Sequence, residues 1–453
     1  MQLVDLVRES VIGDNEEVEG PYGKKLITYA DYTASGKALG FIEEYISQQV
    51  LPLYGNSHTQ TSKTGRQTTL FMEEARTMIK DYTGCTKKDA LVFVGSGCTA
   101  AANRLVQMLG LSASSEVKDV LQRDHPDMCR TVVFVSSHEH HSNLLPWRES
   151  LAEVVCIPDD PCTGNLSLVA LEACLVKYAD RPLKIGAFSA ASNVTGIVED
   201  VDAVSILLHR HGALAVWDYA CSGPYVEIDM NARVEGAHTG AHKDAVFISP
   251  HKFVGGPQTP GVLIFKKELS GRRDRCSLPG GGSVFYVSSE EHVYLRHCEE
   301  REEAGTPALV GAIRCGLAFQ LKHRIGCYRI AELDDGICQR VLSCMARHPS
   351  IHVLGSTSSR RLPIVSFMVH CQGMYLHYNY VCALLNDLFG IQVRGGCMCA
   401  GPYSQELLGI APELSGRFLR ELRKKEDNEV IRPGYVRLSL HYSMSEIEEQ
   451  TIA

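Results

Sequence analysis

Short apolar runs alternate with longer helix-like stretches through the first two thirds of the chain. The runs are rich in Val, Ile and Phe, and they are Ala90–Val94, Thr131–Val135, Leu183–Phe188, Ala213–Trp217 and Ala245–Ile248. Gly261–Lys266 extends the series after a Gly- and Pro-rich turn. Short continuous apolar runs are typical of strands buried on both faces, and their alternation with helices indicates βαβ units. We therefore predict an α/β fold with a mainly parallel central sheet flanked by helices.

The pattern changes near residue 312. Helix-like stretches then precede strand-like runs, and the segments are Arg314–Arg324, Asp335–Arg347, Ile351–Leu354, Ile364–Met368 and Val436–Leu440. This order is typical of an α+β domain. We expect an N-terminal arm at residues 1–28 that packs with the small domain, a large domain at 29–311 and a small domain at 312–453.

Charge and cysteine content exclude several classes of protein. Lys and Arg number 45 against 53 Asp and Glu, and this net charge of −8 argues against a nucleic-acid binder with a broad basic surface. No apolar stretch of about 18 residues occurs, so no membrane span is expected. Residues 1–20 mix apolar with acidic side chains, unlike a basic targeting leader. The 17 cysteines are scattered and odd in number, which favours a reduced cytoplasmic protein over a disulfide framework.

Ligands of open parallel sheets bind beyond the carboxyl ends of the strands, so the residues after each run are the candidates for chemistry. The Gly-rich turn at residues 95–99 follows the first run and opens a helix, where exposed N–H groups favour an anion such as phosphate. It lacks the Gly-Lys-Ser/Thr ending of a nucleotide P-loop, and a plain tight turn is the alternative. His138, His140 and His141 follow the second run. They suit ring stacking, proton transfer or metal binding, or else a solvated polar loop.

The next three runs are followed by an amide, a carboxylate and an amine side chain. These groups belong to Asn193, Asp218 and Lys252. Each alone has an ordinary structural explanation, but the combination with a phosphate cradle and a histidine fits pyridoxal phosphate (PLP). A lysine carries that cofactor, and an aspartate keeps its pyridine nitrogen protonated so that the ring accepts electrons.

At this point the sequence resembles the class V aminotransferase and cysteine desulfurase family of fold type I PLP enzymes. The resemblance runs from Tyr29-Ala30-Asp31 to Arg437-Leu438-Ser439-Leu440. It implies that Lys252, in the Ser-x-His-Lys motif, carries the cofactor and that Asp218 pairs with the pyridine nitrogen.

The resemblance and the Gly-rich turn together imply further cofactor contacts, which are Asn193, Ser249, His251, Cys98, Thr99 and the stacking ring His140, with His141 as the alternative ring. Thr306 matches a family threonine that reaches the phosphate of the neighbouring subunit, which implies a homodimer. Cys221 stands where the family often has a glutamine that hydrogen-bonds the cofactor's phenolic oxygen, and a thiol is a poor substitute.

The segment Val393–Pro402 discriminates between members of the family. Its Arg-x-Gly-x-x-Cys pattern is similar to that of group II desulfurases and implies that Cys399 is the nucleophile, with Cys397 as the alternative. Its Cys-x-Cys form is also similar to molybdenum cofactor sulfurases, which usually carry a further C-terminal domain. Gly-rich flanks suit a mobile loop. Arg437 matches the arginine that grips the substrate carboxylate, and Arg394 assists it.

These resemblances imply a cysteine desulfurase that converts L-cysteine to L-alanine and leaves a persulfide on Cys399 for an acceptor protein. No metal is expected, because a site built from Cys397, Cys399 and the histidine cluster leaves Lys252 and Asp218 unexplained. The alternatives are an aminotransferase, a selenocysteine or other carbon–sulfur lyase, an epimerase, and a catalytically silent partner on the same scaffold.

Overall fold

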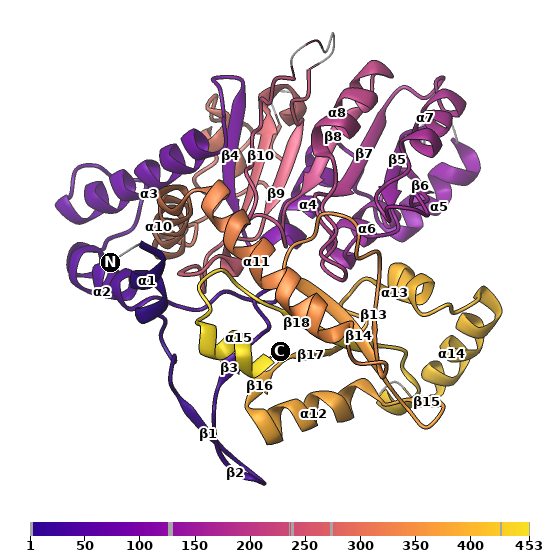
Figure 1. Cartoon of the computed structure of the whole chain (residues 1–453). Coiled ribbons are helices and arrows are strands. Elements are labelled where there is room, and N and C mark those ends of the chain that lie inside the picture. The colour runs from indigo at the N-terminus through magenta and orange to yellow at the C-terminus, as the bar shows by residue number, and fades with distance from the viewer. Residues whose placement is uncertain are drawn as a thin grey trace.

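The structure is a computed structural model that describes residues 3–125, 130–234, 236, 240–271, 275–425 and 428–452. Its centre is a seven-stranded sheet of order β4-β10-β9-β8-β7-β5-β6 (Figure 1). The strands are β4 (Asp89–Val94), β5 (Val132–Ser136), β6 (Glu153–Ile157), β7 (Lys184–Ser189), β8 (Leu214–Asp218), β9 (Ala245–Ile248) and β10 (Gly261–Lys266). Only β10 is antiparallel to its neighbours, β4 and β9. The predicted mainly parallel sheet is therefore confirmed.

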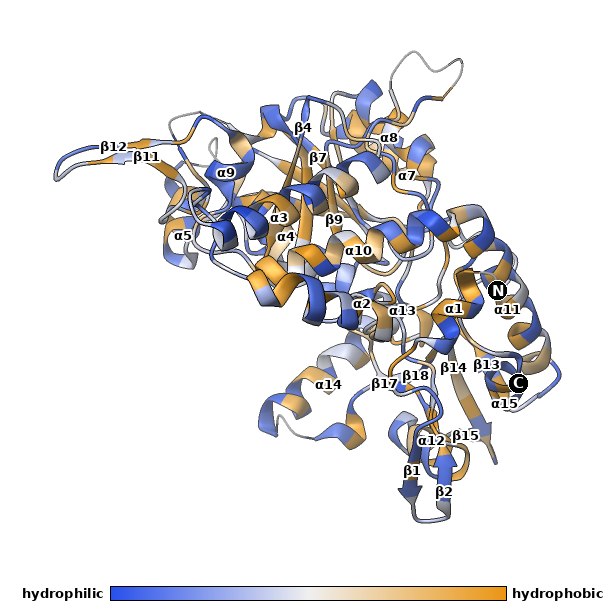
Figure 2. Ribbon diagram, turned by 90° about the vertical axis from the view of Figure 1, so that its left-hand side faces the viewer, coloured by the Kyte–Doolittle hydropathy of each residue, from blue (hydrophilic) through white to orange (hydrophobic). Residues whose placement is uncertain are grey.

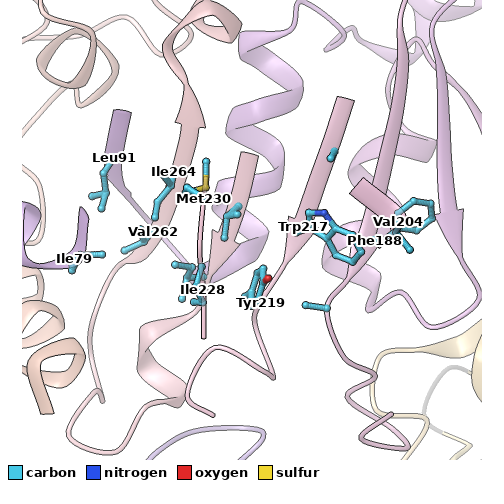
Figure 3. Close-up of a cluster of buried hydrophobic side chains, with 14 of the residues drawn as sticks. Ile79, Leu91, Phe188, Val204, Trp217, Tyr219, Ile228, Met230, Val262 and Ile264 are labelled. Atoms are coloured by element: carbon cyan, nitrogen blue, oxygen red, sulfur yellow. The ribbon is translucent and has the colours of Figure 1, made fainter. Parts of the chain in front are cut away.

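Helices cover both faces of this sheet. One face carries α3 (Lys63–Tyr82), α7 (Leu168–Lys177), α8 (Val201–Arg210) and α10 (Leu309–Ile325), and the other carries α4 (Gly97–Met108) and α6 (His141–Arg148). Trp217 of β8 packs with Phe188 of β7 at a ring-centroid distance of 6.0 Å (Figure 3), and its indole N–H donates to Ser205 of α8. Both faces of the strands are thus sealed, as their continuous apolar runs require.

The C-terminal part is built on an antiparallel sheet. Its strands are β13 (Ile351–Val353), β14 (Ile364–Cys371), β15 (Met374–Tyr375), β17 (Arg394–Gly396) and β18 (Tyr435–Ser439), and its helices include α11 (Cys327–Met345), α12 (Tyr378–Phe389) and α15 (Glu446–Ile452). The N-terminal segment joins this part, because β3 (Thr28–Tyr29) pairs in parallel with β16 (Ile391–Gln392). Helix α10 packs in the core of the central sheet. The predicted boundary at residue 312 stays a prediction.

The remaining elements lie around these two sheets. They are α1 (Leu3–Glu9), β1 (Glu17–Gly20), β2 (Gly23–Leu26), α2 (Gly40–Tyr45), α5 (Ser115–Asp124), β11 (Val284–Val287), β12 (His292–Tyr294), α9 (Cys298–Glu302), α13 (Gly401–Leu407) and α14 (Pro412–Lys424). The hairpin β11–β12 extends away from the rest of the chain (Figure 2). Within the described ranges, no helix is long and apolar enough to cross a membrane, and every cysteine there is free.

Candidate active site

A cavity of about 490 Å³ is lined by residues from the carboxyl edge of the central sheet and from the C-terminal part of the chain. The loops after β5, β7, β8 and β9 open into it, because parallel strands end at the same edge of a sheet. The predicted site residues that line it are Lys252, Asp218, His140, Asn193, Ser249, His251, Cys98, Thr99, Cys397, Cys399, Arg394 and Arg437. Thr306 is not part of this lining.

The lysine and the aspartate reach the cavity from neighbouring strands. Asp218 is the last residue of β8 and is 3% exposed, and Lys252 ends the short 3₁₀ turn Pro250–Lys252 after β9. Burial raises the pKa of Asp218, although the Ala220 N–H at 2.7 Å and the Lys252 ammonium oppose that rise. A buried carboxylate that already accepts an amide N–H and lies near a cation suits a pairing with a protonated ring nitrogen.

His140 is a neutral imidazole on the cavity wall. It caps α6, and its Nδ1 accepts the N–H of Ser142 at 3.1 Å, so the proton of the neutral ring is on Nε2. Burial, and then the Lys252 ammonium, lower the pKa of His140 to about 3. His141, the alternative ring, instead accepts the N–H of Gly401 at 3.0 Å and does not line the cavity. His140 is therefore the histidine placed to stack on a planar ligand.

The third histidine of the cluster is buried away from the cavity. The Nε2 of His138 lies 2.8 Å from Asp159, and its Nδ1 lies 3.4 Å from Glu199. Burial lowers the pKa of His138, but the two carboxylates outweigh it and raise the pKa to about 10. The protonated ring of His138 thus links its own loop to the two loops that carry Asp159 and Glu199. It also packs against Tyr403 of α13, and the two ring centroids are 4.4 Å apart.

This charge makes stability depend on pH. A histidine whose pKa is raised by folding contributes stability that is complete below its unfolded pKa of about 6.5 and is lost as pH approaches 10. We expect the free energy of unfolding to fall between these pH values, and His138→Gln to flatten this part of the profile. Denaturant unfolding at several pH values measures it, with His141→Gln as the control. A profile that His138→Gln leaves unchanged contradicts the ion pairs.

A cradle for an anion lies at the start of α4. Gly97 has a φ of 55°, and a Cβ there would lie 2.7 Å from the hydroxyl of Ser249 and 2.9 Å from the ring of His251, so only glycine fits. The Cys98 N–H donates to the Ser249 hydroxyl at 2.9 Å. The Thr99 and Ser142 hydroxyls lie 2.6 Å apart. Hydroxyls beside the N–H groups of a helix N-terminus form a site that favours phosphate.

The cysteine segment at residues 397–399 is fastened through its backbone. The carbonyl of Cys397 accepts the hydroxyl of Ser404 at 2.9 Å, and the carbonyl of Cys399 accepts the N–H of His141 at 2.7 Å. Both Met398 and Cys399 have a φ of 53°, a conformation that costs a non-glycine residue of the order of 1–3 kcal/mol. The mobility that the Gly-rich flanks predict stays a prediction; in the structure these two hydrogen bonds tie the segment to its surroundings.

Asn193 contributes to this fastening. The sequence places its amide against the cofactor, and in the structure its Nδ2 donates to the carbonyl of Met398 at 2.9 Å. A net hydrogen bond of about 1 kcal/mol implies that Asn193→Ala accelerates hydrogen exchange of the amides at 398–401 about fivefold. Exchange measured by mass spectrometry tests this. Asn103→Ala, which removes only a bond to the Thr99 carbonyl, is the matched control. Equal exchange in both variants would show that Asn193 does not hold the segment.

Two arginines share one carboxylate at the opposite wall. Arg394 and Arg437 face each other directly across β17 and β18. Asp31 lies between them, with one oxygen 2.9 Å from Arg437 Nη2 and the other 2.9 Å from Arg394 Nε. This carboxylate offsets the repulsion of like charges in a directly opposed pair. Arg437 is 3% exposed, and its Nε is buried without a hydrogen-bond partner among the described residues, which leaves a donor for a further anion.

Cys221 does not take the place of the missing glutamine. Its thiol donates to the carbonyl of Ala191 at 3.0 Å and does not line the cavity, and burial raises its pKa to about 12. The buried thiol of Cys98 lies beside Asp218 instead, and burial together with that carboxylate raises the pKa of Cys98 well above its ordinary value. Both thiols are therefore protonated and unsuited to nucleophilic attack at neutral pH.

Thr306 is exposed on the surface of the part of the chain that contains the central sheet. Its hydroxyl lies 3.4 Å from the side-chain amide of Asn56. Its segment is anchored by Glu303, which accepts hydrogen bonds from Arg76 at 2.9 Å and from the N–H of Phe93. The contact of Thr306 with a neighbouring subunit stays a prediction.

Sequence reasoning missed several residues of the site. Asp31 does not line the cavity itself but holds two of its arginines, and it belongs to the Tyr29-Ala30-Asp31 motif that marks the start of the resemblance, so a signal for it was present. Others include Ser142, Tyr378, Asn379, Glu429 and Arg432. Ser142 lies in α6, two residues after His140, whereas the other four belong to the C-terminal part and reach the cavity only because that part packs against the central sheet.

Comparison with known proteins decides the family. The family model described as aminotransferase class-V matches residues 28–448. The chain belongs to the class-V aminotransferase family. Among similar class-V proteins, a probable cysteine desulfurase of Halalkalibacterium halodurans is 25% identical over 427 residues, which cover 91% of this chain and 96% of the relative. A cysteine desulfurase of Escherichia coli is 27% identical over 404 residues, 88% and 89% of the two chains.

Solved structures share the class-V fold. The apo structure of a cysteine desulfurase from Thermococcus onnurineus superposes with a TM-score of 0.76 at 24% identity, covering 100% of this chain and 96% of that one. A cysteine desulfurase from Escherichia coli gives a TM-score of 0.68 at 20% identity over 94% and 92% of the chains. The predicted fold type I architecture is thereby confirmed.

Class-V aminotransferases are PLP-dependent enzymes, and the residues present fit the cofactor. The cavity holds a primary amine, a buried carboxylate and a neutral histidine ring. The anion cradle at Gly97 has no room for a Cβ because the Ser249 and His251 side chains fill that space. These are the groups that a phosphorylated pyridine aldehyde requires.

Proposed function

We propose that the protein is a cysteine desulfurase that removes sulfur from L-cysteine, releases L-alanine and leaves a persulfide on Cys399. One observation carries the proposal: the segment with Cys397 and Cys399 lines the same cavity as Lys252 and Asp218. Transamination requires the lysine and the aspartate but no thiol. The family and the names of the similar proteins support the same activity.

The cavity residues divide the binding of PLP among themselves. Lys252 would hold the aldehyde carbon, Asp218 would pair with the pyridine nitrogen and His140 would stack on the ring. The start of α4, with Ser249 and His251, takes the phosphate. When bound, PLP supplies an electron sink for the Cα of an amino acid.

Arg437 and Lys252 act on the backbone atoms of the substrate. The free Nε of Arg437 and its guanidinium plane bind the α-carboxylate, with Arg394 beside it. Asp31 holds both arginines in place, so that the carboxylate enters a preformed site. The amine of Lys252, free once the substrate's own amine has taken its place on the cofactor, would take the proton from Cα.

Cys399 acts on the sulfur of the substrate. Its thiolate attacks that sulfur, so that an S–S bond forms as the Cβ–S bond of the substrate breaks. The electron pair of the broken bond stays with Cβ, and protonation of this carbon gives the methyl group of alanine. Arg394 interacts electrostatically with Cys399. His140, with its proton on Nε2, lines the same cavity and is placed to donate a hydrogen bond to the substrate sulfur.

Product analysis tests the proposal. The PLP-loaded protein is incubated with L-cysteine and, in parallel, with L-selenocysteine. We expect alanine in amounts that equal persulfide plus sulfide. Pyruvate and ammonia in place of alanine would indicate a carbon–sulfur lyase, and a keto acid that retains sulfur would indicate an aminotransferase. Absence of cofactor absorbance would favour a catalytically silent partner. The comparison of the two substrates decides between cysteine and selenocysteine.

We also infer that two copies share each cavity through Thr306. The exposure of Thr306 outside the cavity of its own chain supports this, as does the anchoring of its segment by Glu303. Mixed dimers of Thr306→Ala and Lys252→Ala chains test it. One of the two cavities in such a dimer lacks both groups and the other lacks neither, so we expect mixing to restore activity that the Lys252→Ala homodimer lacks. A monomeric protein with full activity would contradict the inference.

A further inference from the structure

Three metal-ligating side chains meet at the edge of the central sheet opposite the cavity. His209 lies near the C-terminal end of α8, and His242 and Asp244 lie in the segment that leads into β9. One donor atom from each side chain lies within 4.8 Å of the other two. Asp244 precedes the first residue of β9, whereas Lys252 follows its last, so the length of a strand separates this cluster from the active site. The activity proposed above makes no use of it.

The carboxylate of Asp244 organises the cluster. It is 4% exposed, and its Oδ2 accepts the N–H of Ala215 at 2.7 Å, which fixes its orientation at the start of β8. The same oxygen lies 3.0 Å from Nε2 of His209, and Oδ1 lies 3.8 Å from Nε2 of His242. Two donors bound to one tetrahedral zinc at about 2.0–2.2 Å lie about 3.3 Å apart. The pair His209–Asp244 is therefore already spaced to share an ion.

The second ring nitrogen of His209 makes the hydrogen bond that is typical of a metal-bound histidine. Nδ1 of His209 lies 2.8 Å from the carbonyl of Gly240 and donates to it, which turns Nε2 toward Asp244. A backbone carbonyl on the second nitrogen is the usual partner of a metal-bound imidazole. Lys266, the cation that acts on both histidines, is paired with Asp89 at 2.7 Å.

Gly240 also makes room for the third ligand. A Cβ at this position would lie 2.9 Å from Nδ1 of His242, so the ring occupies space that only glycine leaves. The rings of His242 and His209 stack at 4.0 Å with 16° between their planes, and the Nε2 atom of each faces the Asp244 carboxylate. The His242 side chain is 39% exposed. A tilt of this exposed ring directs its lone pair to an ion held by the other two groups, and the exposure gives the ion a path from solvent.

We propose that His209, His242 and Asp244 form a Zn²⁺ site whose fourth position is open to water. Two imidazole nitrogens and one carboxylate oxygen are a ligand set that suits this borderline ion. Bound zinc joins the end of α8 to the segment before β9, and it stabilises the folded chain in proportion to its occupancy.

Titration of the full-length, metal-free protein with Co²⁺ and with Zn²⁺ tests the site. We expect one equivalent of Co²⁺ to give d–d absorption without thiolate charge-transfer bands, which separates this site from the free cysteines. His242→Ala is expected to weaken the affinity for this one equivalent of Co²⁺ by at least about tenfold. It is also expected to abolish the rise in melting temperature that Zn²⁺ causes. His211→Ala, at the residue that caps the C-terminal end of α8 and pairs with Glu172, is the matched control and keeps both signals.

His209→Gln and Gly240→Ala are expected to give the same loss as His242→Ala. Because His242 is largely at the surface, its replacement leaves the fold intact, and unchanged melting without metal verifies this. Equal stoichiometry and equal cobalt spectra in the unmodified protein and His242→Ala would overturn the proposal. A cobalt spectrum that consists wholly of thiolate charge-transfer bands would also overturn it. Neither result depends on desulfurase activity.

Discussion

Replacement of Cys399 by alanine is expected to lower the rate of alanine formation from L-cysteine by at least about a thousandfold, because the proposed mechanism assigns the acceptance of sulfur to this thiol. Cofactor absorbance is expected to persist, since Cys399 contributes its thiol and not a cofactor contact. The segment is held through the carbonyls of Cys397, Met398 and Cys399, which the substitution retains. Persulfide labelling and alanine analysis measure the effect.

Cys397→Ala is the matched control for this experiment. Its thiol lines the same cavity, two residues away along the same strained segment. Activity that survives in this variant assigns the nucleophile to Cys399. Loss in Cys397→Ala with full activity in Cys399→Ala would reverse the two roles, and full activity in both would remove the thiol from the mechanism.

Arg437→Ala is expected to lower kcat/KM for L-cysteine by about a hundredfold. Removing one partner of a buried, hydrogen-bonded charge pair costs about 2–5 kcal/mol, and here it also leaves the Asp31 carboxylate with Arg394 as its remaining guanidinium. The loss is expected mainly in KM, because the carboxylate is bound in the ground state as well as in the transition state.

Cysteamine, which lacks the carboxylate, provides the control for Arg437→Ala. The unmodified enzyme is expected to discriminate strongly against it, and the variant is expected to lose most of that discrimination. A variant that discriminates as strongly as the unmodified enzyme would show that Arg437 does not bind the carboxylate. Unchanged cofactor absorbance and melting temperature exclude a general effect on the fold.

The sequence predicted the central sheet well because its strands are buried on both faces and so read as continuous apolar runs. Five predicted strands match β4, β5, β7, β8 and β9 to within one residue at each end. The edge strand β6 escaped prediction, because Glu153 and Cys156 are exposed and interrupt the apolar pattern.

The chemistry of the site was predictable where it follows a strand end, and not where it depends on packing. Lys252, Asp218 and the Gly97 turn stand at or just after strand ends, so their positions made them candidates, and their combination together with the family resemblance gave them roles. The role of Asp31 could not, because it arises from the pairing of β17 with β18 about 400 residues away in sequence. The hydrogen bond of Asn193 to Met398 likewise joins two parts of the chain that share no local pattern.

Reduction of the PLP-loaded protein with borohydride, followed by peptide mass spectrometry, tests most directly whether one cavity gathers the cofactor's groups. Borohydride fixes the cofactor to the lysine that holds it. A single pyridoxyl label on Lys252, lost in Lys252→Ala, is the expected result. A label on any other lysine, or a protein that binds PLP without a reducible linkage, would contradict the proposed site.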